Sequence, residues 1–186
     1  MKYISVGSID KKGYEARLEI RRAGFVFPVT GELADLWLRG STGFASAETP
    51  LELQSLTQLE RRGLVVRADG SSAEEYRALT KCTLVPVDIK NPYWMLSKTE
   101  TTVLRWLRES GLRISMAELV WLMDRKVELE PELLGKENVQ ALVQRIYTSD
   151  TIFDNLLENQ MEYAQERERV VHALLRLLRK KRMILL

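Results

Sequence analysis

The chain has 186 residues, of which 45% are hydrophobic and 29% charged, and its formal net charge is +2. This composition is ordinary for one large or two small globular domains, and a charge so close to zero does not by itself indicate nucleic acid. The N-terminal residues lack a signal-peptide pattern, no apolar run reaches the roughly 18 residues of a membrane span, and Cys82 stands alone. We therefore expect a cytoplasmic protein without disulfides or membrane contacts.

The N-terminal half is predicted to fold as strands around two main helices. Apolar and charged residues alternate from Tyr14 to Ile20, which is the period of a half-buried strand, and residues 3–6 are its expected partner. Thr49-Pro50 with Glu52 forms a capping box at the start of the second helix. We expect further strands over residues 25–29, 64–67 and 83–87, and helices over 30–39, 49–62 and 73–79. A linker is expected over about 87–95.

The C-terminal half is predicted to be helical. Capping boxes at Ser97–Glu100 and Ser115–Glu118 open two helices. Two amphipathic stripes follow, one of Val139, Leu142, Val143 and Ile146 and one of Phe153, Leu156, Leu157 and Met161. Residues 150–182 contain neither Gly nor Pro, so they form either one long helix or two that break near 165–167. The last helix is basic and amphipathic and continues directly into a strand over residues 183–186.

The end of the second helix and the end of the last helix share a pattern. Seven residues match at one constant spacing, pairing Leu56, Leu59, Arg61, Arg62, Leu64, Val65 and Val66 with Leu175, Leu178, Lys180, Lys181, Met183, Ile184 and Leu185. A basic amphipathic helix that runs into a short strand is how the third helix of a winged-helix unit enters its wing. The match therefore predicts two such units in tandem.

Two segments strengthen this interpretation through a family resemblance. LSKTETTVLRWL resembles the opening helix of bacterial winged-helix and helix-turn-helix regulators, and ISMAELVWLM resembles their second helix. The resemblance covers residues 96–186 and implies a helical winged-helix-like unit there. Together with the repeated pattern, it leads us to expect an α+β fold, mainly α, whose first unit, over residues 1–88, is β-rich and degenerate. In such families the recognition helix follows the second helix closely. Here inserted helices over about 136–162 come between them.

Basic residues at three- or four-residue steps form the candidate DNA-binding face of the last helix, opposite its leucine stripe. They are Arg169, His172, Arg176, Arg179 and Lys180. Lysine and arginine neutralise phosphates, and arginine also reads guanine in the major groove. The alternative is a solvated face that pairs with Glu166 and Glu168. In the first unit, Gln58 and Arg62 are candidates on an outward face that also holds Ser55 and Arg61, although Glu52 would repel phosphates there.

Most of the tryptophans are expected in the core, and Trp121 is the exception. Met116, Leu119, Val120 and Met123 already form the buried stripe of its helix, so Trp121 and Leu122 need a second covering surface. Either the inserted helices or a partner subunit would provide it. Inserted stripes that exceed what one chain can cover would pair across a two-fold axis, which predicts a homodimer.

The residues for catalysis or for a metal are missing. His172 is the only histidine and lies on a basic helix, and no glycine-rich phosphate loop follows a strand. Glu128, Glu130 and Glu132 surround Pro131 in what we interpret as a solvated loop. We therefore expect that the protein is not an enzyme and binds no metal or cofactor. From the basic face of the last helix, we expect a transcriptional regulator that binds double-stranded DNA. The alternative is a winged-helix-like adaptor that binds a protein partner and no DNA.

Overall fold

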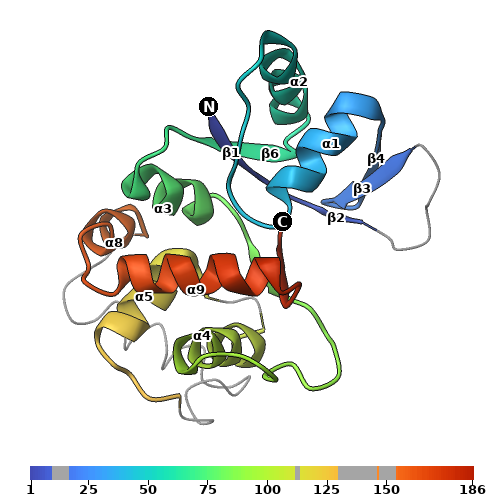
Figure 1. The fold of residues 1–186 in the computed structure, drawn as a ribbon. Helices are drawn as coiled ribbons and strands as arrows, with labels where there is room; N and C mark the ends of the chain where they lie inside the picture. The colour runs from blue at the N-terminus through green and yellow to red at the C-terminus, as the bar shows by residue number, and fades with distance from the viewer. Residues whose placement is uncertain (10–16, 112–113, 130–145, 147–153) are drawn as a thin grey trace.

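The computed structural model describes residues 1–9, 17–111, 114–129, 146 and 154–186, and it has an α+β fold of helices with small antiparallel sheets (Figure 1). The predictions for residues 14–16, 130–132, 139–143 and Phe153 lie outside these residues. Within the described part of the chain, no helix is long and apolar enough to cross a membrane.

The N-terminal part, residues 1–68, contains a three-stranded sheet, a three-stranded meander and two helices. The sheet has the order β5-β1-β6, with β1 at Lys2–Ser5, β5 at Ala45–Ser46 and β6 at Val65–Ala68. The meander joins β2 (Ser8–Ile9), β3 (Leu18–Arg22) and β4 (Phe25–Val29). The helices are α1 (Gly31–Gly40) and α2 (Pro50–Arg61), and the Thr49–Glu52 capping box opens α2 as predicted.

The predicted pairing of residues 3–6 with the strand that ends at Ile20 is wrong. Strand β1 pairs with β5 and β6, whereas β3 pairs with β2 and β4. Tyr3 and Ile4 point to opposite faces of the sheet, yet both are fully buried, because one face packs on α1 and the other on the C-terminal helices. Strand β1 is therefore the central strand of its sheet, hydrogen-bonded on both sides and covered on both faces.

The described residues of the C-terminal part, which covers 84–186, form helices and one two-stranded sheet. The helices are α4 (Lys98–Glu109), α5 (Met116–Asp124), α8 (Asp154–Met161) and α9 (Arg167–Arg179). Strand β7 (Leu84–Pro86) pairs with β8 (Met183–Leu185), and α3 (Ser72–Thr80) links the two parts. The capping boxes at Ser97 and Ser115 are both present, as predicted.

Contacts cross the expected division between residues 88 and 96. One hydrophobic core contains Tyr3 and residues of α1 and α2. The other combines Ile4 of β1, and Val6 just after it, with residues of α3, α4, α5 and α9. The amide of Gly7 also donates to the carbonyl of Leu185 at 2.7 Å. The two parts therefore share buried surface and backbone hydrogen bonds.

Helices α2 and α9 end in the same hydrogen-bonded motif. In each, the residue after the C-cap has a positive φ, +68° at Gly63 and +54° at Lys181. Two amides then bond back into the helix, from Gly63 to Glu60 and from Leu64 to Leu59 in α2, and from Lys181 to Leu178 and from Arg182 to Leu177 in α9. By these bonds, Leu59 of α2 is equivalent to Leu177 of α9, whereas the sequence match made it equivalent to Leu178.

The strands that follow these helices also pair alike. Strand β6 is antiparallel to the strand that opens its part, with Ile4 opposite Val66, and β8 is antiparallel to β7, with Val85 opposite Ile184. Each pairing is extended by one more backbone hydrogen bond, to the residue that follows the positive-φ residue. The amide of Val6 donates to the carbonyl of Leu64 at 2.9 Å, and that of Val87 to the carbonyl of Arg182 at 2.8 Å. The chain therefore repeats one arrangement in which an opening strand pairs with the strand after the last helix.

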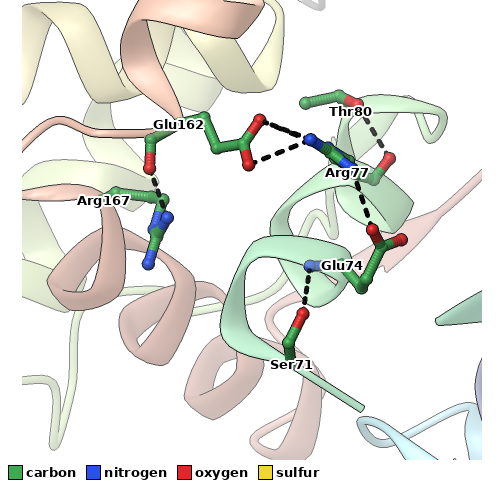
Figure 2. Close-up of polar contacts among 6 residues, drawn as sticks. All are labelled: Ser71, Glu74, Arg77, Thr80, Glu162 and Arg167. Atoms are coloured by element: carbon green, nitrogen blue, oxygen red, sulfur yellow. Dashed lines mark hydrogen bonds and ion pairs between the residues drawn. The ribbon is translucent and has the colours of Figure 1, made fainter. Parts of the chain in front are cut away.

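The chain from residue 154 to residue 179 forms two helices and not one. Helix α8 ends at Met161 and α9 begins at Arg167, close to the predicted break. Arg77 of α3 donates three hydrogen bonds to the Glu162 carboxylate, and Arg167 donates to the Glu162 carbonyl (Figure 2). These contacts hold the turn between α8 and α9 against α3.

Candidate nucleic-acid interface

Helix α9 is buried on one side and exposed on the other. Its buried residues are Val170, Val171, Ala173, Leu174, Leu177 and Leu178, which follow helical spacing. Figure 1 shows α9 lying between α3 and α4, and it contacts both of them as well as α5. The remaining face carries the predicted cations.

Two of those cations attach α9 to the start of α4. Arg169 donates through Nε to the Thr99 hydroxyl at 3.1 Å and also pairs with Glu166 at 3.2 Å. Lys180 donates to both carboxylate oxygens of Glu100 and to the carbonyl of Met95, each at 3.0 Å. Arg169 and Lys180 lie at opposite ends of the basic face, yet both reach the residues at the start of α4. The N-terminal end of α4 therefore lies beside the middle of this face. Arg169 and Lys180 therefore have structural partners.

Glu100 is a buried carboxylate, with 2% of its surface exposed. Burial by itself raises its pKa, but the amide of Ser97, at 2.6 Å, and the Lys180 ammonium favour the charged form, and the resulting pKa lies below its usual value. Glu100 thus both caps α4 and neutralises Lys180.

The other three candidates are exposed and lack such partners. The side chains of His172, Arg176 and Arg179 form no hydrogen bond or ion pair with any other residue that the structure describes. Arg176 lies between Arg169 and Lys180 along the helix, so it faces the same side as the start of α4. These three side chains are free to contact phosphates.

The candidates in α2 occupy a similar surface. Gln58 and Arg62 are exposed, as is Arg61. The prediction that Ser55 faces outward is wrong, because only 6% of Ser55 is exposed. By the shared helix-end motif, Gln58 and Arg61 correspond to Arg176 and Arg179. The outward face of α2 is therefore less basic than that of α9.

Trp121 and Leu122 are covered within the chain. They are 7% and 0% exposed, and they belong to the core cluster that includes Leu157 and Met161 of α8. The guanidinium of Arg125 lies 5.9 Å from the centre of the Trp121 ring. Of the two predicted covering surfaces, the inserted helical segment is the one present here, and neither residue is accessible to a partner.

The expectation that most tryptophans lie in the core does not hold for Trp94, which belongs to an exposed segment before α4. Trp94 and Met95 are 68% and 72% exposed, and their carbonyls accept hydrogen bonds from Arg182 and Lys180. A useful sequence signal was available, because Trp94 lies in the expected linker between Pro92 and Ser97 and not on an amphipathic stripe.

An ion-pair network fixes the N-terminal end of α9. Figure 2 shows Arg77 between Glu74 and Glu162, while Ser71 caps α3. Arg167 also donates to the Ser72 hydroxyl at 3.0 Å. Since Glu162 is 7% exposed, the pair is shielded from solvent on its acidic side. The network sets the position of the basic face relative to α3.

The described residues also bear on catalysis and metal binding. They contain no group of three or more His, Cys, Asp or Glu side chains that could hold a metal ion. Burial raises the pKa of the Cys82 thiol to about 11, so it remains protonated and a poor nucleophile at neutral pH.

Searches of protein-family models, curated proteins and solved structures find no significant match to this chain.

Proposed function

We propose that this protein is a DNA-binding transcriptional regulator of two winged-helix-like units, in which α9 is the recognition helix for double-stranded DNA. The observation that carries the proposal is that some basic residues on this face of α9 have structural partners and others do not. Arg169 and Lys180 tie the helix to α4, while His172, Arg176 and Arg179 remain exposed and unpaired among the described residues. Cations left free at helical spacing are suited to phosphate contacts and to guanine.

The repeated strand and helix-end arrangement supports the tandem part of the proposal. In both parts a helix with exposed cations ends in the same motif and continues into a strand paired with the opening strand. The α9 copy is the more basic, so we assign DNA contact first to α9 and only secondarily to Gln58 and Arg62. No catalytic, metal or cofactor role forms part of the proposal.

The test removes the two free arginines together, as Arg176→Ala with Arg179→Ala, and measures binding to mixed genomic fragments at two salt concentrations. If both contact phosphates, the slope of log K against log salt falls by about 1.8, at about 0.9 per phosphate. If one reads guanine, specific binding loses about 1–3 kcal/mol. The melting temperature should not change, because both side chains are exposed.

A charge-matched control is Arg17→Ala with Lys81→Ala, two exposed cations outside α9. It should bind like the parent. A separate variant, Gln58→Ala with Arg62→Ala, asks whether the first part also contributes. Equal binding by parent and α9 variant, or no binding by the parent at low salt, would end the DNA proposal.

A protein-interaction module is the second candidate, and one observation favours it. Strand β4 is the outer strand of its sheet among the described residues, and Phe25 and Val26 on it are 69% and 50% exposed. An unpaired edge with apolar side chains can accept a peptide strand. Pro28 removes one donor from that edge, which limits the length of such a pairing.

We also propose that the protein forms a homodimer. Leu156 of α8 is 49% exposed, although its neighbour Leu157 is buried, so part of the predicted stripe faces outward. Sedimentation at micromolar concentration tests this, and Leu156→Asp should shift a dimer toward monomer. A parent that sediments as a monomer throughout would contradict it.

A further inference from the structure

The segment between β7 and α4 presents apolar side chains to solvent. Tyr93, Trp94 and Met95 are 37%, 68% and 72% exposed. The other three tryptophans, Trp37, Trp106 and Trp121, are each 7% exposed or less. Three consecutive exposed apolar side chains form a patch, and exposed apolar patches often mark binding sites.

Backbone contacts hold this segment in place. Within it, the amide of Trp94 donates to Asn91 at 3.2 Å, and the amide of Leu96 donates to Tyr93 at 3.3 Å. Asn91 and Met95 have φ values of +52° and +58°, a conformation that side chains rarely adopt without support. That support comes from the end of α9, because Lys180 bonds the Met95 carbonyl at 3.0 Å and Arg182 bonds the Trp94 carbonyl at 3.4 Å.

Several cations lie close to the segment along the chain or next to a residue that contacts its backbone. Lys90 and Lys98 flank the segment in sequence, and Arg179 and Lys181 adjoin Lys180, which contacts it. All four are exposed, and their side chains form no hydrogen bond or ion pair with other described residues. The nearby acids are already engaged, Asp88 with Arg108 and Glu100 with Lys180. An aromatic surface bordered by unpaired cations is complementary to a base and its phosphates.

We propose that Trp94 is a stacking platform for an unpaired base of single-stranded nucleic acid, whose phosphates lie against Lys98, Arg179 and Lys181. The inference rests on the proposed function in one respect, because the same basic end of α9 would supply phosphate contacts. An acidic peptide would satisfy the cations but not use the flat face of the indole. Continuity with the basic face of α9 therefore favours nucleic acid.

The test follows tryptophan fluorescence during titration with oligothymidylate, with a blunt duplex and with an oligoglutamate peptide of equal charge. Because Trp94 is the exposed tryptophan, stacking should quench the solvent-exposed part of the emission. Trp94→Leu should abolish that quenching and weaken oligothymidylate binding by roughly 5- to 150-fold, the range for loss of one base–aromatic stack. Trp94→Phe, which keeps a flat ring, should retain most of the affinity.

The matched control is Tyr163→Leu, since Tyr163 is 83% exposed and belongs to the turn after α8. It should bind oligothymidylate like the parent, and all variants should keep the parental melting temperature. Unquenched binding, or equal affinities of Trp94→Leu and parent, would overturn the stacking site. Stronger quenching by oligoglutamate would overturn it in favour of an acidic partner. Duplex binding that still depends on Arg176 and Arg179 would show that the proposed function survives such a failure, whereas absence of all nucleic-acid binding would overturn both.

Discussion

Replacing Lys180 with alanine distinguishes a structural cation from a DNA-binding one. The change leaves Glu100, whose side chain is 3% exposed, without its ion-pair partner. Removing one member of a buried pair costs about 3–5 kcal/mol, whereas an exposed pair contributes about 0–1 kcal/mol. Lys180 is 38% exposed, and Glu100 keeps its bond from Ser97 at 2.6 Å, so we expect a loss between these limits, about 1–2 kcal/mol.

Thermal unfolding measures this loss. For a chain of this size each kcal/mol shifts the melting temperature by about 2–4 °C, so Lys180→Ala should melt about 2–8 °C below the parent. Arg179→Ala is the matched control, because Arg179 is the exposed neighbour without a described partner, and it should melt like the parent. In a Glu100→Gln background, Lys180→Ala should cost less, because the charge that it leaves unpaired is gone.

The effect should also depend on pH. The pKa of Glu100 is lowered from 4.5 in the folded protein, so its stabilising contribution is present above that unfolded value and is lost as pH falls through the lower folded pKa. The difference between Lys180→Ala and parent should therefore shrink in acid. If Lys180→Ala and Arg179→Ala melt within about 1 °C of each other at neutral pH, where each kcal/mol is worth about 2–4 °C, the ion-pair reasoning is refuted. Lys180 would then count, like Arg179, as a cation available to bind DNA.

Two further changes test the helix end and the α3 network. Lys181→Gly should raise stability by about 0.5–1 kcal/mol, because Lys181 has a left-handed backbone at the position that Gly63 occupies in α2. A rise of the same size in Lys181→Ala, which keeps the strain, would contradict this explanation. Glu162→Gln should cost about 1–2 kcal/mol and speed amide exchange at the start of α9, because it weakens the charge-assisted bonds from Arg77. Glu74→Gln, at the more exposed pair on the same arginine, should cost under about 0.5 kcal/mol; equal losses would argue against a special role for Glu162.

The sequence by itself determined the features that depend on neighbouring residues. Capping boxes at Thr49, Ser97 and Ser115 formed as expected, because cap and acid lie only three residues apart. The buried stripe and the exposed cations of α9 also followed from helical periodicity. The similarity of the ends of α2 and α9 was visible too, although hydrophobic matching placed it one residue away from the hydrogen-bond register.

Only the tertiary structure decided which of those residues are free. The partners of β1, the turn at Glu162 and the pairing of Lys180 with Glu100 join positions far apart in the chain. Periodicity reports which face of a helix is polar, but not which neighbouring element approaches that face. Trp94 shows the same limit, because whether an aromatic residue is buried depends on what surrounds it and not on its own hydrophobicity. For this reason the basic helix could be read from the sequence, and its division into anchoring and free cations could not.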